Sequence, residues 1–247
     1  MRQLISTLSA RLPLPALILL LQTPARGEAY GKPRPFKMHV LLLLMAMIGR
    51  TDATAQPTPP AVLFPQLSKT LDSLAYVDQW PRQRMFQQQP DSAGRNLEQV
   101  EKENYARHQP ILEKIVRQYG YPGFRQVGEK SATNFWLLVQ HADAYPKFQR
   151  QVLRLMKLEV KRKNANPVNY AYLTDRVALN TGHLGEYGTQ VIYEGAGPTI
   201  RAVARPLRKP ARVNKRRAAV GLEPLETYLE NTTNMTREMN APKDYVK

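Results

Sequence analysis

The chain has 247 residues, with 36 lysines and arginines against 20 aspartates and glutamates, and its formal net charge is +16. It contains no cysteine, which excludes disulfides, a thiol nucleophile and a lipid-modified N-terminal cysteine. Because disulfides are excluded, the fold must be stabilised by core packing alone, and the length allows one sizeable hydrophobic core.

The first 55 residues read as a targeting region. Residues 38–55 form a signal peptide, with an apolar core at 40–48 and a small-residue cleavage site at Ala53-Thr54-Ala55. Residues 1–37 would then be an upstream extension that precedes the true start. Two transmembrane helices are the competing interpretation, but each apolar run has about ten residues where a span needs about 20. We therefore expect an exported protein, periplasmic or secreted, with no transmembrane span in its mature form.

The mature chain divides into three parts. A proline-rich linker occupies 56–65, a single helical domain 66–230 and a flexible tail 231–247. The expected fold class is mainly α, with a small β-hairpin or short strand pair in the C-terminal third.

The first helix of the domain begins at Leu67, and its apolar residues follow a helical period. Asp78 continues the same stripe one turn later. It therefore points toward the core or marks the end of the helix, and Pro81 favours the end because the residue before a proline is biased away from helical angles.

Four further helices follow along the chain. One is expected at 96–107 with a restart at Pro110, and the most apolar one at 131–141. Pro146 and Pro167 each suit a first helical turn, so each opens another helix.

The hydrophobic period changes in the C-terminal third. The β-rich runs 189–193 and 199–203 flank a glycine-rich turn and predict a hairpin. A short helix at 213–220 and a last one at 224–229 complete the domain.

The segment 201–217 contains eight basic residues and no acidic one. Such a segment indicates an anionic small molecule, an acidic surface polymer or lipid headgroups as partner, or an ordinary solvated basic face. We do not expect nucleic acid as the partner of an exported protein.

Ionisable side chains directly follow apolar ones in the run 135–143 (FWLLVQHAD). Burying such groups unpaired is costly, so Gln140, His141 and Asp143 should meet partners inside the fold. A histidine beside a carboxylate is the usual arrangement for acid–base catalysis, because the carboxylate fixes the tautomer and stabilises the imidazolium. The alternative is a structural network in which Asp143 caps the helix opened by Pro146.

A second group of candidates lies at 173–190. Asp175 and Arg176 are adjacent on a helix and face different partners, and Arg176 could clamp an anion or tie two helices together through Asp78 or Asp143. Tyr187, Gly188 and Gln190 belong to a Tyr-Gly-Thr-Gln segment whose glycine would let the backbone approach a ligand.

Metal binding is the weaker interpretation of these residues. His183 and Glu186 could join His141 and Asp143 as ligands, but two glycines make 182–185 a loop rather than a ligand-presenting helix. We expect no metal and no cofactor, and Walker and dinucleotide glycine patterns are missing. A serine hydrolase is disfavoured because the sequence has no Gly-x-Ser-x-Gly elbow.

The order of several short motifs resembles a bacterial family of unknown function. The motifs are Asp78-Gln79 with Arg82, Tyr119-Gly120-Tyr121-Pro122, the run 136–143, Asp175-Arg176, Tyr187-Gly188-Thr189-Gln190, Arg217, Gly221-Leu222-Pro224-Leu225 and Tyr228. The resemblance covers most of 66–230. It implies a predominantly helical, often exported domain, and it implies nothing about a substrate.

Two functions remain open at this level. In one, the protein is a binding or structural module and the polar residues form a buried network. In the other, it is a hydrolase or lyase in which His141 is the acid–base residue, oriented by Asp143 or Asp175. Arg176 would then bind an anionic group, while Gln140, Gln190 and the Gly188 backbone would position the substrate.

Overall fold

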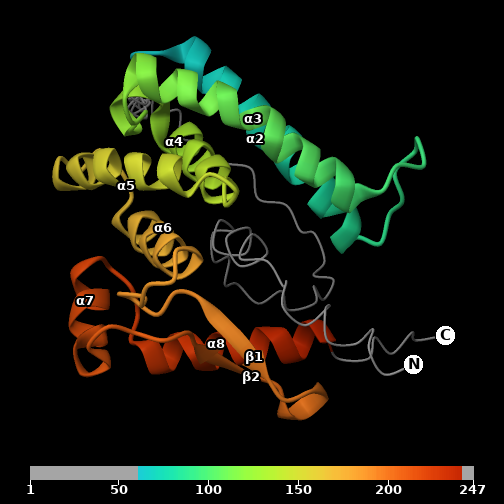
Figure 1. Cartoon of the computed structure of the whole chain (residues 1–247), viewed down its shortest axis with the longest axis vertical. Coiled ribbons are helices and arrows are strands. Elements are labelled where there is room, and N and C mark those ends of the chain that lie inside the picture. Colours follow the sequence, from blue (N-terminus) through green and yellow to red (C-terminus); the bar gives the residue numbers. More distant parts are fainter. Residues whose placement is uncertain (1–60, 241–247) are drawn as a thin grey trace, which may run out of the picture. The chain divides into compact units, whose positions relative to one another are not determined.

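Residues 61–240 are described by the computed structural model, and they form seven α helices and one two-stranded antiparallel sheet (Figure 1). The elements in chain order are α2 (Pro65–Phe86), α3 (Leu97–Tyr119), α4 (Phe124–Gln140), α5 (Pro146–Lys161), α6 (Pro167–Asn180), β1 (Val191–Glu194), β2 (Arg201–Ala204), α7 (Val213–Ala219) and α8 (Leu225–Asn240). The expected fold class is confirmed. The predicted targeting region 1–55, the linker up to residue 60 and residues 241–247 lie outside the described residues.

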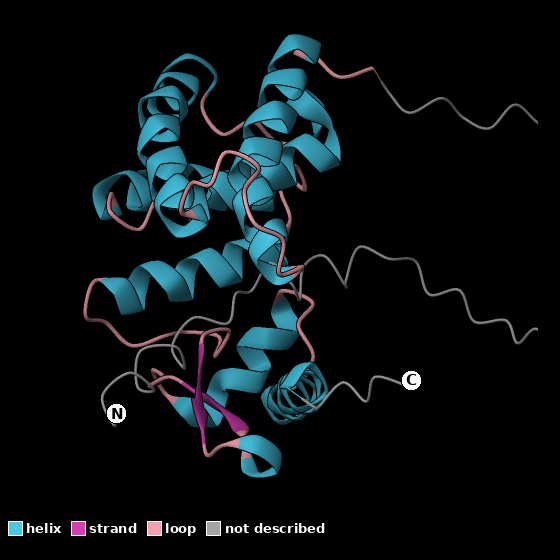
Figure 2. Ribbon diagram, turned by 90° about the vertical axis from the view of Figure 1, so that its right-hand side faces the viewer, coloured by secondary structure: helices cyan, strands magenta, loops and turns pink. Residues whose placement is uncertain are grey.

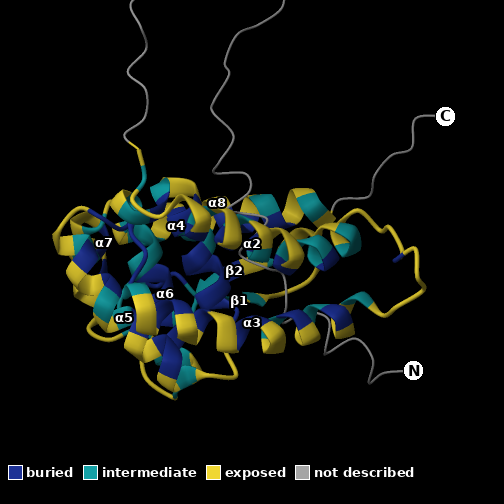
Figure 3. Cartoon of the chain, turned by 90° about the horizontal axis from the view of Figure 1, so that it is seen from above, coloured by how far each residue is buried: buried dark blue, intermediate teal, exposed yellow. Residues whose placement is uncertain are grey.

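Helix α2 packs against both α3 and α4, and this contact contains much of the apolar core. Leu71 from α2, Leu112 from α3 and Phe135 with Trp136 from α4 are almost completely shielded from water. In Figure 3 the buried residues of the helices are dark blue. Each such side chain contributes about 1.5–3 kcal/mol relative to an exposed one. Helix α4 also contacts α5 and α6, so it is the shared element of the helical part.

Two prolines lie inside helices instead of ending them. Helix α2 continues through Pro81 to Phe86, so the expectation that it ends at Asp78 is wrong. A proline inside a helix leaves the carbonyl four residues earlier without its N–H partner. Here that carbonyl belongs to Val77, and the side-chain amide of Asn104 donates to it at 2.9 Å. A neighbouring helix thus supplies the hydrogen bond that the proline removes.

Helix α3 likewise runs without a break through Pro110, where a restart was expected. Its buried stripe, which includes Val100, His108 and Leu112, stays on one face on both sides of the proline. Packing of that stripe against α2 and α4 outweighs the local cost of the proline.

A glycine interrupts helix α4. The helix is assigned from Phe124, earlier than the expected Ser131, but Gly128 within it has φ 79° and ψ 161°. That conformation interrupts the helix and is one that glycine adopts readily. Helices α5 and α6 both begin with a proline in the first turn, as expected.

The C-terminal part holds the hairpin and the last two helices (Figure 2). Strands β1 and β2 pair in the register Val191↔Ala204 to Glu194↔Arg201, which confirms the predicted strand pair. Helix α8 packs on β2, and the hydroxyl of Thr233 accepts a 2.9 Å hydrogen bond from the Ala202 amide.

Helix α8 continues to Asn240, well beyond the expected end at residue 229, so residues 231–240 are helical and not a flexible tail. On its buried side, the hydroxyls of Thr233 and Thr236 donate to the carbonyls of Leu229 and Thr232 at 2.7 and 2.8 Å, so these polar groups are satisfied within the helix. No helix within residues 61–240 is both long and apolar enough to cross a membrane.

Candidate functional site

The carboxylate of Asp78 lies at the meeting point of α2, α3 and the end of α4. Nδ1 of His141 lies 2.7 Å from its Oδ2, and the side-chain amide of Gln79 donates to the same oxygen at 2.7 Å. On the other side, Nδ1 of His108 lies 3.7 Å from Oδ1. Two imidazoles therefore face the two oxygens of one carboxylate whose side chain is only 1% exposed.

The electrostatics of this cluster keep Asp78 ionised. Burial by itself would raise the pKa of the carboxyl, but the charge of a protonated His141, the hydrogen bonds from His141 and Gln79 and the nearby His108 ring outweigh it and hold the pKa below its ordinary value. An ionised carboxylate can only accept hydrogen bonds, so Nδ1 of His141 must be the donor. The proton of a neutral His141 ring is then on Nδ1, and Nε2 carries a free lone pair.

Tyr105 fixes the plane of His141. The two rings stack with their centroids 4.9 Å apart and a tilt of 39°. Arg82 donates to the Tyr105 hydroxyl at 3.3 Å and forms a salt bridge of 2.6 Å with Glu101. Burial is the main cause of the raised pKa of Tyr105, so its hydroxyl stays protonated near neutral pH.

Several polar atoms of this cluster have no hydrogen-bond partner among residues 61–240. Buried atoms of this kind are Oδ1 of Asp78, Nδ1 of His108 and Oε1 of Gln140. Nε2 of His141 also has none there, although 5% of that side chain is exposed. Unpaired buried atoms also occur outside the cluster, for example Nε1 of Trp136 and Nη2 of Arg217. The feature of interest here is therefore the His141 ring, whose Nδ1 is paired with Asp78 while Nε2 has no partner among residues 61–240.

Asp143 lies two residues beyond His141 but contacts different groups. Its carboxylate accepts two hydrogen bonds from Arg176, at 2.9 and 2.6 Å, and one from Asn180 at 2.8 Å. Gln149 donates to it as well, at 3.2 Å. Asp143 therefore connects the end of α4 to α6. This is one of the two pairings considered for Arg176, with Asp143 and not Asp78 as its partner. The described structure gives it no contact with His141, and no hydrogen bond from its side chain caps α5.

Asp175 is completely buried and serves as an anchor for the segment 186–189. Its oxygens accept backbone hydrogen bonds from Glu186 at 2.6 Å, Tyr187 at 3.0 Å and Thr189 at 2.8 Å, and a further one from the Thr189 hydroxyl at 3.0 Å. Both oxygens are fully used by these donors. Asp175 therefore does not orient His141, which is what the sequence alone had suggested for it.

The predicted ligand-binding segment is built into the packing of the C-terminal part. Gly188 has φ 69°, and a Cβ at this position would lie 2.8 Å from a methyl group of Leu225. The carbonyl of Tyr187 accepts a 2.7 Å hydrogen bond from Arg217, which is itself buried. The side chain of Gln190 donates to the neighbouring Thr189 hydroxyl at 3.5 Å, and the Gln190 carbonyl accepts a 3.0 Å hydrogen bond from the Arg205 amide. Gly188 and the Tyr187 backbone thus hold α7 and α8 in place.

The four residues weighed as metal ligands are held in separate contacts. His183 lies against the Thr181 hydroxyl at 3.1 Å, and Glu186 pairs with Arg208 and Arg216. Across residues 61–240, no three histidine, aspartate or glutamate side chains are grouped closely enough to hold a metal ion.

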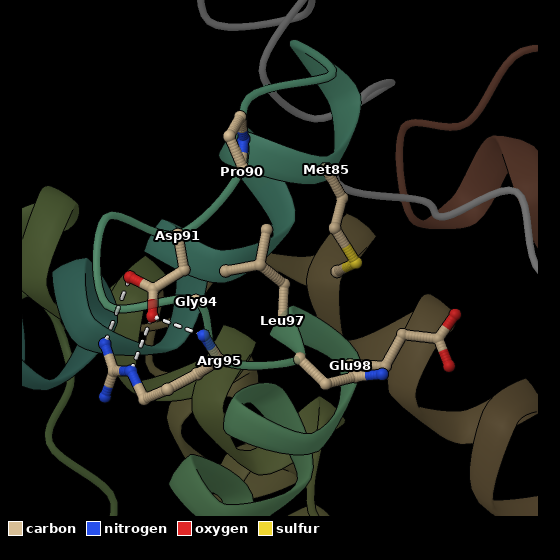
Figure 4. Close-up of a pocket in the computed structure, with 8 residues that line it drawn as sticks. Met85, Pro90, Asp91, Gly94, Arg95, Leu97 and Glu98 are labelled. Atoms are coloured by element: carbon tan, nitrogen blue, oxygen red, sulfur yellow. Dashed lines mark hydrogen bonds and ion pairs between the residues drawn. The ribbon is translucent and has the colours of Figure 1, made fainter.

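A cavity of about 320 Å³ lies at the loop that joins α2 to α3 (Figure 4). Met85 and Leu97 line it together with the ion pair between Asp91 and Arg95. Hydrogen bonds from Arg95 lower the pKa of Asp91 to about 2, so this carboxylate has no proton to exchange near neutral pH. The lining contains no histidine, and we therefore place the candidate site at Asp78.

Sequence reasoning identified His141 but missed the residues around it. Asp78 was placed on a helical stripe, in a family motif and as a possible partner of Arg176, but not beside His141, and His108, Tyr105 and Glu101 were not singled out. One signal was available: His108 lies eight residues after Val100 and four before Leu112, so a continuous helix places all three on one face. The expected break at Pro110 concealed that pattern.

No curated protein and no solved structure is similar enough to the chain to count as a match. The family of unknown function DUF6624 matches residues 65–235, which span the helical part, the hairpin and most of α8. The chain therefore belongs to this family of unknown function.

Proposed function

We propose that the domain is a hydrolase-type enzyme in which His141 is the general base and Asp78 orients it. One observation carries the proposal: a buried, ionised carboxylate holds Nδ1 of His141 at 2.7 Å, while Nε2 has no partner among the described residues. This is the arrangement that general-base catalysis by an imidazole requires.

The chemistry follows from the two ring nitrogens. Nε2 accepts a proton from a water molecule as the water oxygen attacks the substrate, and the resulting imidazolium is stabilised by Asp78 through Nδ1. The same proton then passes from Nε2 to the leaving group, which returns the ring to its neutral form. Tyr105 restricts rotation of the ring, because it stacks on His141 while Arg82 holds its hydroxyl.

A binding or structural module is the second candidate, and a different observation favours it. The side chains of Asp78, His108 and His141 are at least 94% shielded from water, and they join three helices. In that case the cluster would fix helix packing, and small reagents would not reach Nε2 of His141.

The two candidates differ in whether His141 reacts in the folded protein. Diethyl pyrocarbonate acylates a neutral imidazole nitrogen, and peptide mass spectrometry locates the modified histidine. The enzyme hypothesis predicts modification of His141 in the native protein, at a rate that changes in Asp78→Asn. If His141 is modified only after unfolding, the hypothesis is wrong.

Activity is tested with chromogenic esters, phosphoesters and glycosides. His141→Gln and Asp78→Asn should each reduce the hydrolysis rate by roughly 10²–10⁴-fold, the range that general acid–base catalysis contributes. His183→Gln is the matched control, because its ring contacts only Thr181 among the described residues. Loss of activity in the control as well as in the other two variants would contradict the assignment.

Export to the periplasm or the medium is part of the same proposal, and the sequence of residues 38–55 supports it. N-terminal sequencing of protein from its native host should begin at Gln56. A mature protein that retains residues 1–37 would contradict both the cleavage and the assigned start.

A further inference from the structure

Only part of the basic segment 201–217 is paired or buried among residues 61–240. Arg217 is buried, Arg201 pairs with Glu194, and both Arg208 and Arg216 pair with Glu186. The remaining four basic residues are exposed and have no carboxylate within 4 Å among residues 61–240. They are Arg205, Lys209, Arg212 and Lys215.

Hydrogen bonds join the segment that carries these cations to the loop 183–186. Gly185 donates to the carbonyl of Pro206 at 2.9 Å, and the amide of Arg208 donates back to Gly185 at 2.9 Å. Arg216 donates to the carbonyls of Glu186 and Arg208, at 2.6 and 2.7 Å. The loops 183–186 and 205–212 and the start of α7 are thereby joined into one surface, which we call the basic ridge.

The basic ridge also carries an exposed apolar side chain. Leu184 is 52% exposed, and it directly precedes the glycine that pairs with the 206–208 backbone. Pro210 and Ala211, between Lys209 and Arg212, are exposed as well. A soluble polyanion would contact the cations without needing Leu184. At a bilayer surface, by contrast, basic residues meet lipid phosphates while an apolar residue enters the boundary with the acyl chains.

We propose that the basic ridge binds the surface of an anionic phospholipid bilayer. Lys209, Arg212 and Lys215 contact the lipid phosphates, and Leu184 inserts between headgroups. This inference does not depend on the proposed hydrolase activity, since its residues are separate from the Asp78 cluster. It would hold the domain at a membrane surface without a transmembrane span.

The test is co-sedimentation of the mature chain, residues 56–247, with vesicles of phosphatidylcholine, with and without about one third phosphatidylglycerol. Binding should occur only to the anionic vesicles and should weaken as salt is added. The triple variant Lys209→Gln, Arg212→Gln, Lys215→Gln should bind about a hundredfold more weakly, since each cation contributes about 1 kcal/mol, or about fivefold, near such a surface.

Two controls make the result specific. Removing three exposed cations from the α5 region, with Lys157→Gln, Lys161→Gln and Lys163→Gln, changes the net charge equally and should leave vesicle binding within about twofold. Leu184→Ser should weaken vesicle binding about tenfold, but should not change binding to heparin. Circular dichroism establishes that each variant is folded.

Three results would overturn the proposal. They are equal binding to neutral vesicles, equal loss in both triple variants, and wild-type vesicle binding by Leu184→Ser together with full competition by heparin. The last result would indicate a soluble polyanion as the partner.

Discussion

Replacing Asp175 by Asn tests how the segment 186–189 is held. The substitution keeps the shape of the side chain but converts one acceptor oxygen into an NH₂ donor. Oδ1 accepts from the amides of Glu186 and Tyr187, while Oδ2 accepts from the amide and hydroxyl of Thr189. Whichever position the NH₂ group takes, at least one backbone amide that was bonded to a carboxylate loses its acceptor.

The magnitude follows from those contacts. A buried donor left unpaired costs about 1–3 kcal/mol, and hydrogen bonds to a charged acceptor are worth more than neutral ones. The Thr189 amide belongs to a residue that is completely buried, whereas Glu186 and Tyr187 are buried only in part. We expect Asp175→Asn to lower the free energy of unfolding by about 2–4 kcal/mol, and Asp175→Ala by about 3–6 kcal/mol.

Urea unfolding followed by circular dichroism measures both values. Asp143→Asn is the matched control, because its carboxylate is 41% exposed and its ion pair with Arg176 should contribute less than about 1 kcal/mol. A free energy of unfolding for Asp175→Asn that lies within about 0.5 kcal/mol of the wild-type value, or that equals the value for Asp143→Asn, would refute this role of Asp175.

Three further predictions concern other buried contacts. The folded-state pKa of Asp78 is lowered, so its contribution to stability is complete above about pH 4 and is lost as the pH falls through the folded value. Acid titration of the wild type should therefore show a loss of stability below about pH 4 that is smaller in Asp78→Asn. Asn104→Ala should destabilise by about 1–3 kcal/mol in urea unfolding, because it leaves the Val77 carbonyl opposite Pro81 without a donor; an unchanged midpoint would refute this. Gly188→Ala should lower the melting temperature by several degrees, since its positive φ and the contact with the Leu225 side chain disfavour a Cβ; a Tm equal to that of wild type would contradict it.

The helices opened by Pro146 and Pro167, together with the hairpin, could be predicted from the sequence because their signals are local. A proline in a first turn, a helical stripe and a glycine-rich turn each determine the structure of a few neighbouring residues. The continuation through Pro81 could not be predicted in this way, because it depends on Asn104, which comes from another helix.

The site was predictable in part for the same reason. His141 stood out because a polar side chain directly follows a run that must be buried. Its carboxylate partner could not be found by proximity in the sequence: Asp143 is two residues away and Asp78 is 63 residues away, yet of these two only Asp78 lies within hydrogen-bond distance of the ring. Asp175 illustrates the opposite error, because a buried carboxylate can be used entirely by backbone amides.

The tautomer of His141 tests the central claim most directly. Long-range ¹H–¹⁵N correlation spectra of histidine-labelled protein, recorded at a pH where the ring is neutral, distinguish a protonated Nδ1 from a protonated Nε2. We expect His141 with its proton on Nδ1 and a free Nε2 in the wild type, and a changed tautomer population in Asp78→Asn. A proton on Nε2 in the wild type, or identical His141 signals in the two proteins, would contradict the assignment of Asp78 and His141 as an acid–base pair.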